Sequence, residues 1–78
     1  MPSKFIEVCY KDRIIIIGVN WLENQGHYET DYTIWGKQGS NWEIFCQSSL
    51  KQVFGNKEEA FFAGNMSARN WIDELDDN

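Results

Sequence analysis

The hydrophobic periodicity of this chain changes once, and that change constrains the fold more than any other feature of the sequence. Up to about residue 54, apolar residues alternate with polar ones or form short β-branched runs, a pattern typical of strands. After Gly55, apolar residues recur three or four positions apart, as on one face of a helix. The sequence therefore predicts an α+β domain in which a sheet is followed by one C-terminal helix.

The first two strand-like segments, 4–10 and 13–21, are expected to form a hairpin around the dipeptide Lys11-Asp12. A register that pairs Tyr10 with Arg13 brings larger aliphatic side chains together on one face. These side chains are Ile6, Val8, Ile15 and Ile17. The opposite face then carries Phe5, Glu7, Cys9, Ile14 and Ile16.

A second hairpin is predicted for residues 28–36 and 40–47 around Lys37-Gln38-Gly39, with Gly39 in a left-handed conformation next to a bulge. The expected register pairs apolar residues on one face: Ile34 with Trp42, Tyr32 with Ile44, and Thr30 with Cys46. The other face then carries Glu29, Asp31, Thr33, Trp35, Glu43, Phe45 and Gln47.

The C-terminal helix is predicted over about 57–75, with Asn56 as N-cap and Glu59 three residues later. The small residues Ala60, Gly64 and Ala68 share its apolar face, so we expect the helix backbone to lie close to the sheet. A break at Gly64 into two helices is the alternative. The predicted architecture is an antiparallel meander of four to five strands, the fifth over 50–54, with one C-terminal helix packed on one face.

Length and charge limit the functional classes. A chain of 78 residues is expected to form a single domain, 1–78, with a frayed acidic tail from residue 76. Its net charge of −5 disfavours nucleic acid and anionic membranes, so we expect any charged partner to be basic. No apolar run approaches the roughly 18 residues of a membrane span, and two isolated cysteines without a signal peptide indicate a reducing cytoplasm.

No arrangement of residues predicts catalysis. His27 is the single histidine and lies in a polar loop without an orienting partner. Cys9 and Cys46 lie 37 residues apart without a metal-ligand motif, so we expect both to be buried and inert, and we expect no metal and no cofactor. The sheet carboxylates are interpreted as solvated or interface groups: Glu7, Glu29, Asp31 and Glu43. The chain is therefore not expected to be an enzyme.

One helix covers one face of a sheet, so the other face is the predicted partner-binding surface. Its apolar members are Phe5, Ile14, Ile16, Trp35 and Phe45. The acidic end is interpreted as a solubilising tail or as a handle for a basic partner: Asp73, Glu74, Asp76 and Asp77. The leading hypothesis is a cytoplasmic protein-interaction module, such as an adaptor, regulator or inhibitor, that forms a homodimer. The alternative is a ligand or single-stranded nucleic-acid binder that uses the same aromatic residues.

Overall fold

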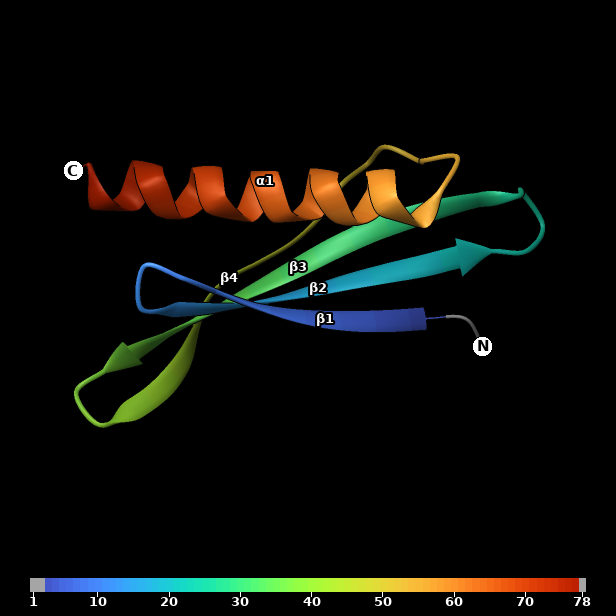
Figure 1. Ribbon diagram of the computed structural model, residues 1–78. Helices are drawn as coiled ribbons and strands as arrows, with labels where there is room; N and C mark the ends of the chain where they lie inside the picture. Colours follow the sequence, from blue (N-terminus) through green and yellow to red (C-terminus); the bar gives the residue numbers. More distant parts are fainter. Residues whose placement is uncertain (1–2, 78) are drawn as a thin grey trace.

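The computed structural model describes residues 3–77 and contains a sheet with one helix on one of its faces (Figure 1). The elements are β1 (Ser3–Tyr10), β2 (Arg13–Leu22), β3 (His27–Gln38), β4 (Asn41–Ser49) and α1 (Lys57–Asp76). The sheet is antiparallel with strand order β1-β2-β3-β4, which confirms the predicted meander. In place of the suggested fifth strand, Phe54 forms an isolated bridge with Tyr28.

The first hairpin has the predicted register, with Tyr10 opposite Arg13. Lys11 and Asp12 form the turn with φ angles of 49° and 63°. Positive φ at both central positions is the signature of a type I′ turn, whose twist matches that of the flanking strands. The strand twist therefore imposes a left-handed conformation on two residues that are not glycine.

The predicted register of the second hairpin is wrong. Gly39, at φ 64°, and Ser40 form a two-residue turn between Gln38 and Asn41. A β-bulge follows, because Ile34 lies opposite Cys46 whereas Trp35 lies opposite Ile44, so that Phe45 is an extra residue in β4. The bulge places the Phe45 ring over Gly36, where a Cβ atom would overlap it, so a glycine at this position accommodates the bulged residue.

The bulge changes which side chains of β4 face the helix. Phe45 and Cys46 pack against the core on the α1 side of the sheet, whereas Trp42 and Ile44 point away from it. The expectation that Phe45 belongs to the uncovered face is therefore wrong. The expectation that Trp42 and Ile44 are core residues is also wrong, since 44% and 50% of their surfaces are exposed.

The helix packs on β2 and β3 through residues spaced four apart: Ala60, Gly64, Ala68 and Ile72. Asn56 caps it by accepting a hydrogen bond from the Glu59 backbone N–H at 2.8 Å, as predicted. The helix continues through Gly64, so the alternative of two helices is wrong. Leu75, in the last turn of the helix, is 41% exposed.

The core consists of residues from both layers: Ile15, Ile17, Val19, Thr30, Tyr32 and Ile34 from the sheet, with Ala60, Ala68 and Ile72 from the helix. Within residues 3–77, no helix combines the length and the apolar character that crossing a bilayer requires. α1 ends at Asp76, and the Asp77 backbone N–H donates to the Asp73 carbonyl at 3.1 Å. This backbone hydrogen bond closes the last turn of the helix.

Candidate interaction surface

On the face of the sheet that points away from α1, here called the open face, residues lie opposite one another in rows across the strands. Three rows cross all four strands, and the pair Lys37 and Trp42 lies beyond them, next to the β3–β4 turn. The first row is Cys9, Ile14, Trp35 and Ile44. The second is Glu7, Ile16, Thr33 and Gln47. The third is Phe5, Gly18, Asp31 and Ser49. The open face is therefore apolar towards the two hairpin turns and polar towards the other end.

The apolar half forms a patch, here called the open-face patch, that consists of Ile14, Ile16, Trp35, Trp42 and Ile44. A hollow of ≈ 400 Å³ lies over it, lined by Glu7 together with every member of the patch except Ile44. The Lys37 ammonium stands 5.6 Å from the centroid of the Trp42 ring, at the β3–β4 end of the patch. The patch thus carries one acidic and one basic side chain at its edges.

The polar half is organised around Asp31. The Asn20 side-chain amide donates to the Asp31 carboxylate at 3.3 Å. Gly18 leaves room for that carboxylate, because a Cβ atom at Gly18 would lie 2.5 Å from Asp31 Oδ1. Phe5 is 68% exposed at this end, so its ring lies on the open face but outside the open-face patch.

The structure brings together three of the residues predicted for the binding surface, Ile14, Ile16 and Trp35, and places Phe5 beyond them on the same face. It moves Phe45 to the opposite side of the sheet. Sequence reasoning missed the two most exposed members of the patch, Trp42 and Ile44. The signal that could have found them is Gly36, whose missing side chain leaves space for a bulky neighbour in the adjacent strand.

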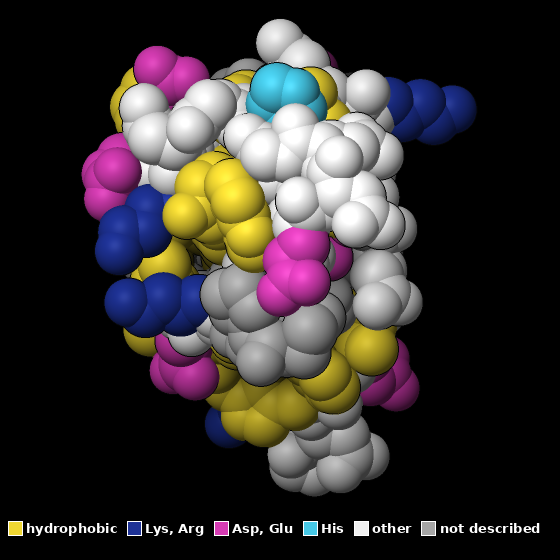
Figure 2. Space-filling view, turned by 90° about the vertical axis from the view of Figure 1, so that its right-hand side faces the viewer, with side chains coloured by type: hydrophobic (Ala, Val, Ile, Leu, Met, Phe, Trp, Pro, Cys, Tyr) yellow, Lys and Arg dark blue, Asp and Glu magenta, His cyan; other side chains and the backbone are white. Residues whose placement is uncertain are grey.

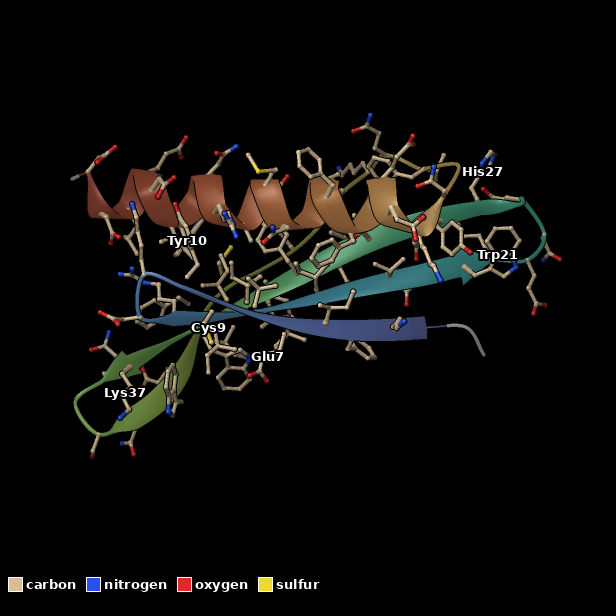
Figure 3. The ribbon with its side chains drawn as sticks, viewed as in Figure 1. Glu7, Cys9, Tyr10, Trp21, His27 and Lys37 are labelled. Atoms are coloured by element: carbon tan, nitrogen blue, oxygen red, sulfur yellow. The ribbon has the colours of Figure 1, made fainter. Side chains whose placement is uncertain are left out.

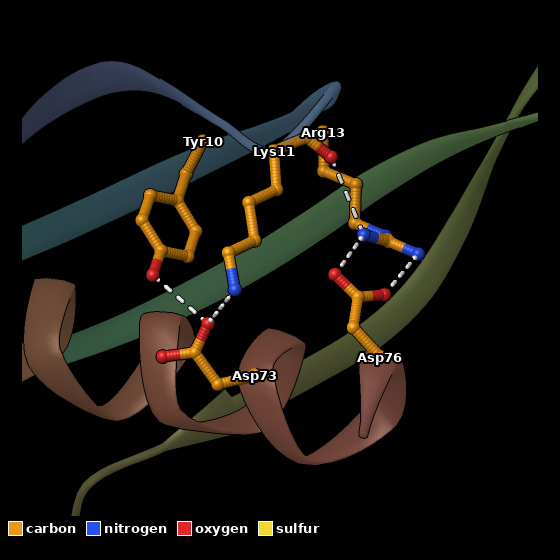
Figure 4. Close-up of polar contacts among 5 residues, drawn as sticks. All are labelled: Tyr10, Lys11, Arg13, Asp73 and Asp76. Carbon is orange, nitrogen blue, oxygen red and sulfur yellow. Dashed lines mark hydrogen bonds and ion pairs between the residues drawn. The ribbon is translucent and has the colours of Figure 1, made fainter. Parts of the chain in front are cut away.

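The acidic end of α1 contacts the β1–β2 turn (Figure 4). Asp73 accepts hydrogen bonds from the Tyr10 hydroxyl at 2.9 Å and from the Lys11 ammonium at 2.6 Å. Asp76 forms an ion pair with Arg13 at 3.0 Å. The Arg69 guanidinium lies 4.8 Å from the centroid of the Tyr10 ring.

These contacts shift the ionisation of the groups involved. The hydrogen bonds from Lys11 and Tyr10 lower the pKa of the Asp73 carboxyl, and the same contacts raise the pKa of both donors. Asp73 and Asp76, two of the predicted handle residues, therefore bind side chains of the β1–β2 hairpin. The other two, Glu74 and Asp77, lie exposed in the last turn and C-cap of α1.

The candidate catalytic residues are dispersed. His27 lies at the opposite end of the sheet from Glu7 and Cys9 (Figure 3). Cys9 is exposed on the open face and Cys46 is partly buried, so the expectation that both thiols are buried is wrong. Residues 3–77 hold no group of three or more His, Cys, Asp or Glu side chains that could bind a metal ion.

Comparison of the chain with protein-family models, with curated proteins and with solved structures finds no match. Inference about function therefore depends on the surfaces described above.

Proposed function

We propose that this protein is a non-catalytic interaction module that binds a second copy of itself through the open face. The observation that carries the proposal is the open-face patch, in which Trp42 and Ile44 are exposed and the other members are partly buried, while α1 packs on the other side of the sheet. Contiguous apolar surface of this kind is uncommon on monomers and marks interaction sites. Tryptophan is also the residue type most enriched at the energetic centres of interfaces.

The size of the open face fits a dimer of modest affinity. Four strands about 4.8 Å apart and eight residues long cover a footprint of roughly 19 Å by 26 Å, or about 500 Å² before side-chain relief. A standard interface buries about 800 Å² per partner. Self-association would therefore use nearly the whole open face, with the open-face patch at its centre, and would be concentration-dependent.

The charges on the open face are self-complementary. Glu7 in β1 belongs to the row on one side of Ile14, and Lys37 in β3 belongs to the row on the other side. Figure 3 labels both charged residues. A two-fold axis that runs parallel to the sheet above Ile14, perpendicular to the line from Glu7 to Lys37, would therefore bring Glu7 of each copy towards Lys37 of the other. Such isologous pairing suits a C2 dimer.

Sedimentation equilibrium across the micromolar range tests the proposal. The average mass of the wild type should rise towards twice that of the monomer, whereas Trp42→Glu should remain a folded monomer. Met66→Glu is the matched control, because Met66 is similarly exposed but lies on α1. A wild type that stays monomeric throughout the range overturns the proposal.

A charge exchange tests the arrangement of the dimer. Glu7→Lys and Lys37→Glu should each weaken association, since each variant places like charges opposite one another, and the double variant should restore it. If the double variant loses as much association as the two single substitutions lose together, the two-fold axis above Ile14 is refuted. This result would leave the open face as the binding surface.

Binding of single-stranded nucleic acid is the less favoured function. Among the described residues, the open face presents Glu7, Glu29 and Asp31 against Lys37. Grooves that bind single strands combine aromatic side chains with an excess of positive charge, so the charge of this face argues against such a ligand. A cytoplasmic location and a role as adaptor, regulator or inhibitor remain parts of the proposal, and the two free cysteines are consistent with that location.

A further inference from the structure

A groove lies on the other side of the sheet, between β1 and the N-terminal half of α1. The small residues Ala60 and Gly64 hold the helix close to β2 and β3, and the wedge that remains beside β1 is open to solvent. The groove, here called the helix-side groove, has a volume of ≈ 600 Å³. That volume falls within the range of small-molecule sites, about 300–1,000 Å³.

The floor of the helix-side groove is apolar. Ile6 lines it from β1, Val19 from β2 and Phe61 from α1. Phe62 also lines it, and 65% of the Phe62 surface is exposed. An apolar chain placed in this groove would cover hydrophobic surface that the fold itself leaves open.

The rim of the groove is cationic, although the whole chain carries a net charge of −5. Lys4 and Lys57 line the groove together with a single acid, Glu58. Among residues 3–77 the ion pairs are formed by Lys11 and Arg13, and neither rim lysine takes part in one. Figure 2 views this end of the molecule, where two neighbouring Lys or Arg side chains stand beside a hydrophobic surface.

We propose that the helix-side groove binds a single-chain fatty acid. The acyl chain would lie against Ile6, Val19 and Phe61, and the carboxylate would accept charge-assisted hydrogen bonds from the two rim lysines. Charge complementarity selects this ligand over a neutral or cationic amphiphile, because the two ammonium groups outnumber the Glu58 carboxylate. The site does not depend on the open face.

Titration with oleate below its micelle concentration, followed by methyl NMR, tests the site. The resonances of Ile6 and Val19 should shift, whereas those of Ile14 and Ile16 on the open face should not. The double variant Lys4→Glu, Lys57→Glu should bind oleate at least about tenfold more weakly, which corresponds to about 1.4 kcal/mol. Single variants supply the control: Lys57→Glu should weaken oleate binding, whereas Lys51→Glu carries the same charge change outside the groove and should bind oleate like the wild type.

Four results would overturn the proposal. Equal affinity for oleate and oleyl alcohol would show that the rim lysines do not bind the carboxylate. Equal affinity of Lys57→Glu and Lys51→Glu for oleate would show the same. Binding to phosphatidylserine vesicles without binding to monomeric oleate would assign the groove to a membrane surface instead. A shift of the Ile14 and Ile16 methyls alone would place the ligand on the open face.

Discussion

Replacing Gly64 with alanine separates what helix propensity predicts from what packing predicts. Glycine in the middle of a helix costs about 1 kcal/mol relative to alanine, so propensity alone predicts that Gly64→Ala stabilises the protein. In the structure, a Cβ atom at this position would lie 2.8 Å from Thr30 Oγ1 and 3.1 Å from Ile17 Cγ2. The two effects therefore have opposite signs.

Neither neighbour of that Cβ atom can move cheaply. Thr30 is 1% exposed, and its hydroxyl donates to the Gly18 carbonyl at 2.9 Å. Ile17 is fully buried, and both side chains are β-branched, with few alternative rotamers. Overpacking of a buried site costs about 1–3 kcal/mol, which exceeds the gain in propensity. We expect Gly64→Ala to lower the free energy of unfolding by about 1 kcal/mol.

Urea denaturation followed by circular dichroism measures this difference. Asn70, exposed on the same helix, supplies the control, because Asn70→Ala and Asn70→Gly differ by helix propensity without a packing contact. In a Thr30→Ala background, from which the nearest colliding atom is absent, Gly64→Ala should cost less than in the wild type. The reasoning is refuted if Gly64→Ala raises the free energy of unfolding by as much as the difference in that free energy between Asn70→Ala and Asn70→Gly.

Three further predictions concern other parts of the chain. Because the pKa of Asp73 is lowered in the folded protein, its contacts contribute their full stabilisation at pH values above its ordinary pKa of 3.8. This stabilisation is lost as the pH falls through the folded-state pKa. The stability deficit of Asp73→Asn relative to the wild type should accordingly be present at neutral pH and vanish in strong acid, which urea titrations at several pH values measure. Phe45→Ala should lower the free energy of unfolding by about 1–3 kcal/mol because the ring packs against the core. Its dimerisation should match that of the wild type by sedimentation, and a monomeric, fully stable variant would contradict the bulge. Cys9 should react with a thiol reagent in the folded protein faster than Cys46, because Cys9 is the more exposed thiol; mass spectrometry of the labelled peptides shows the order.

The elements predicted correctly are those whose signals are local. The first hairpin pairs without a bulge from Tyr10–Arg13 outward, and this register places Ile6 and Val8 opposite Ile17 and Ile15, as predicted. The helix carries its own start signal at Asn56 and a continuous apolar spacing. The sequence left open whether the helix breaks at Gly64, and the structure shows that it does not.

The second hairpin could not be predicted because its register depends on a contact between strands. The Phe45 ring occupies the space above Gly36, and this contact inserts one residue into β4. A pattern of alternation detects no such insertion, and it therefore assigned Trp42 and Ile44 to the wrong face. The ion pairs of Asp73 and Asp76 were missed for a related reason, since their partners lie more than 60 residues away in the sequence.

The bulge gives β4 apolar side chains on both faces of the sheet, and only those on the helix side are needed for folding. Phe45 and Cys46 pack against the core, whereas Trp42 and Ile44 are about half exposed. We therefore expect the double variant Trp42→Thr, Ile44→Thr to lose less than about 1 kcal/mol per site, because substitutions at exposed positions have small effects on stability. The measurement requires a protein concentration at which the wild type is monomeric, so that dissociation does not add to the difference. The same variant should lose self-association in sedimentation experiments. A variant that unfolds would show instead that these two side chains belong to the core of one chain, and the open face would then lose its role as an interface.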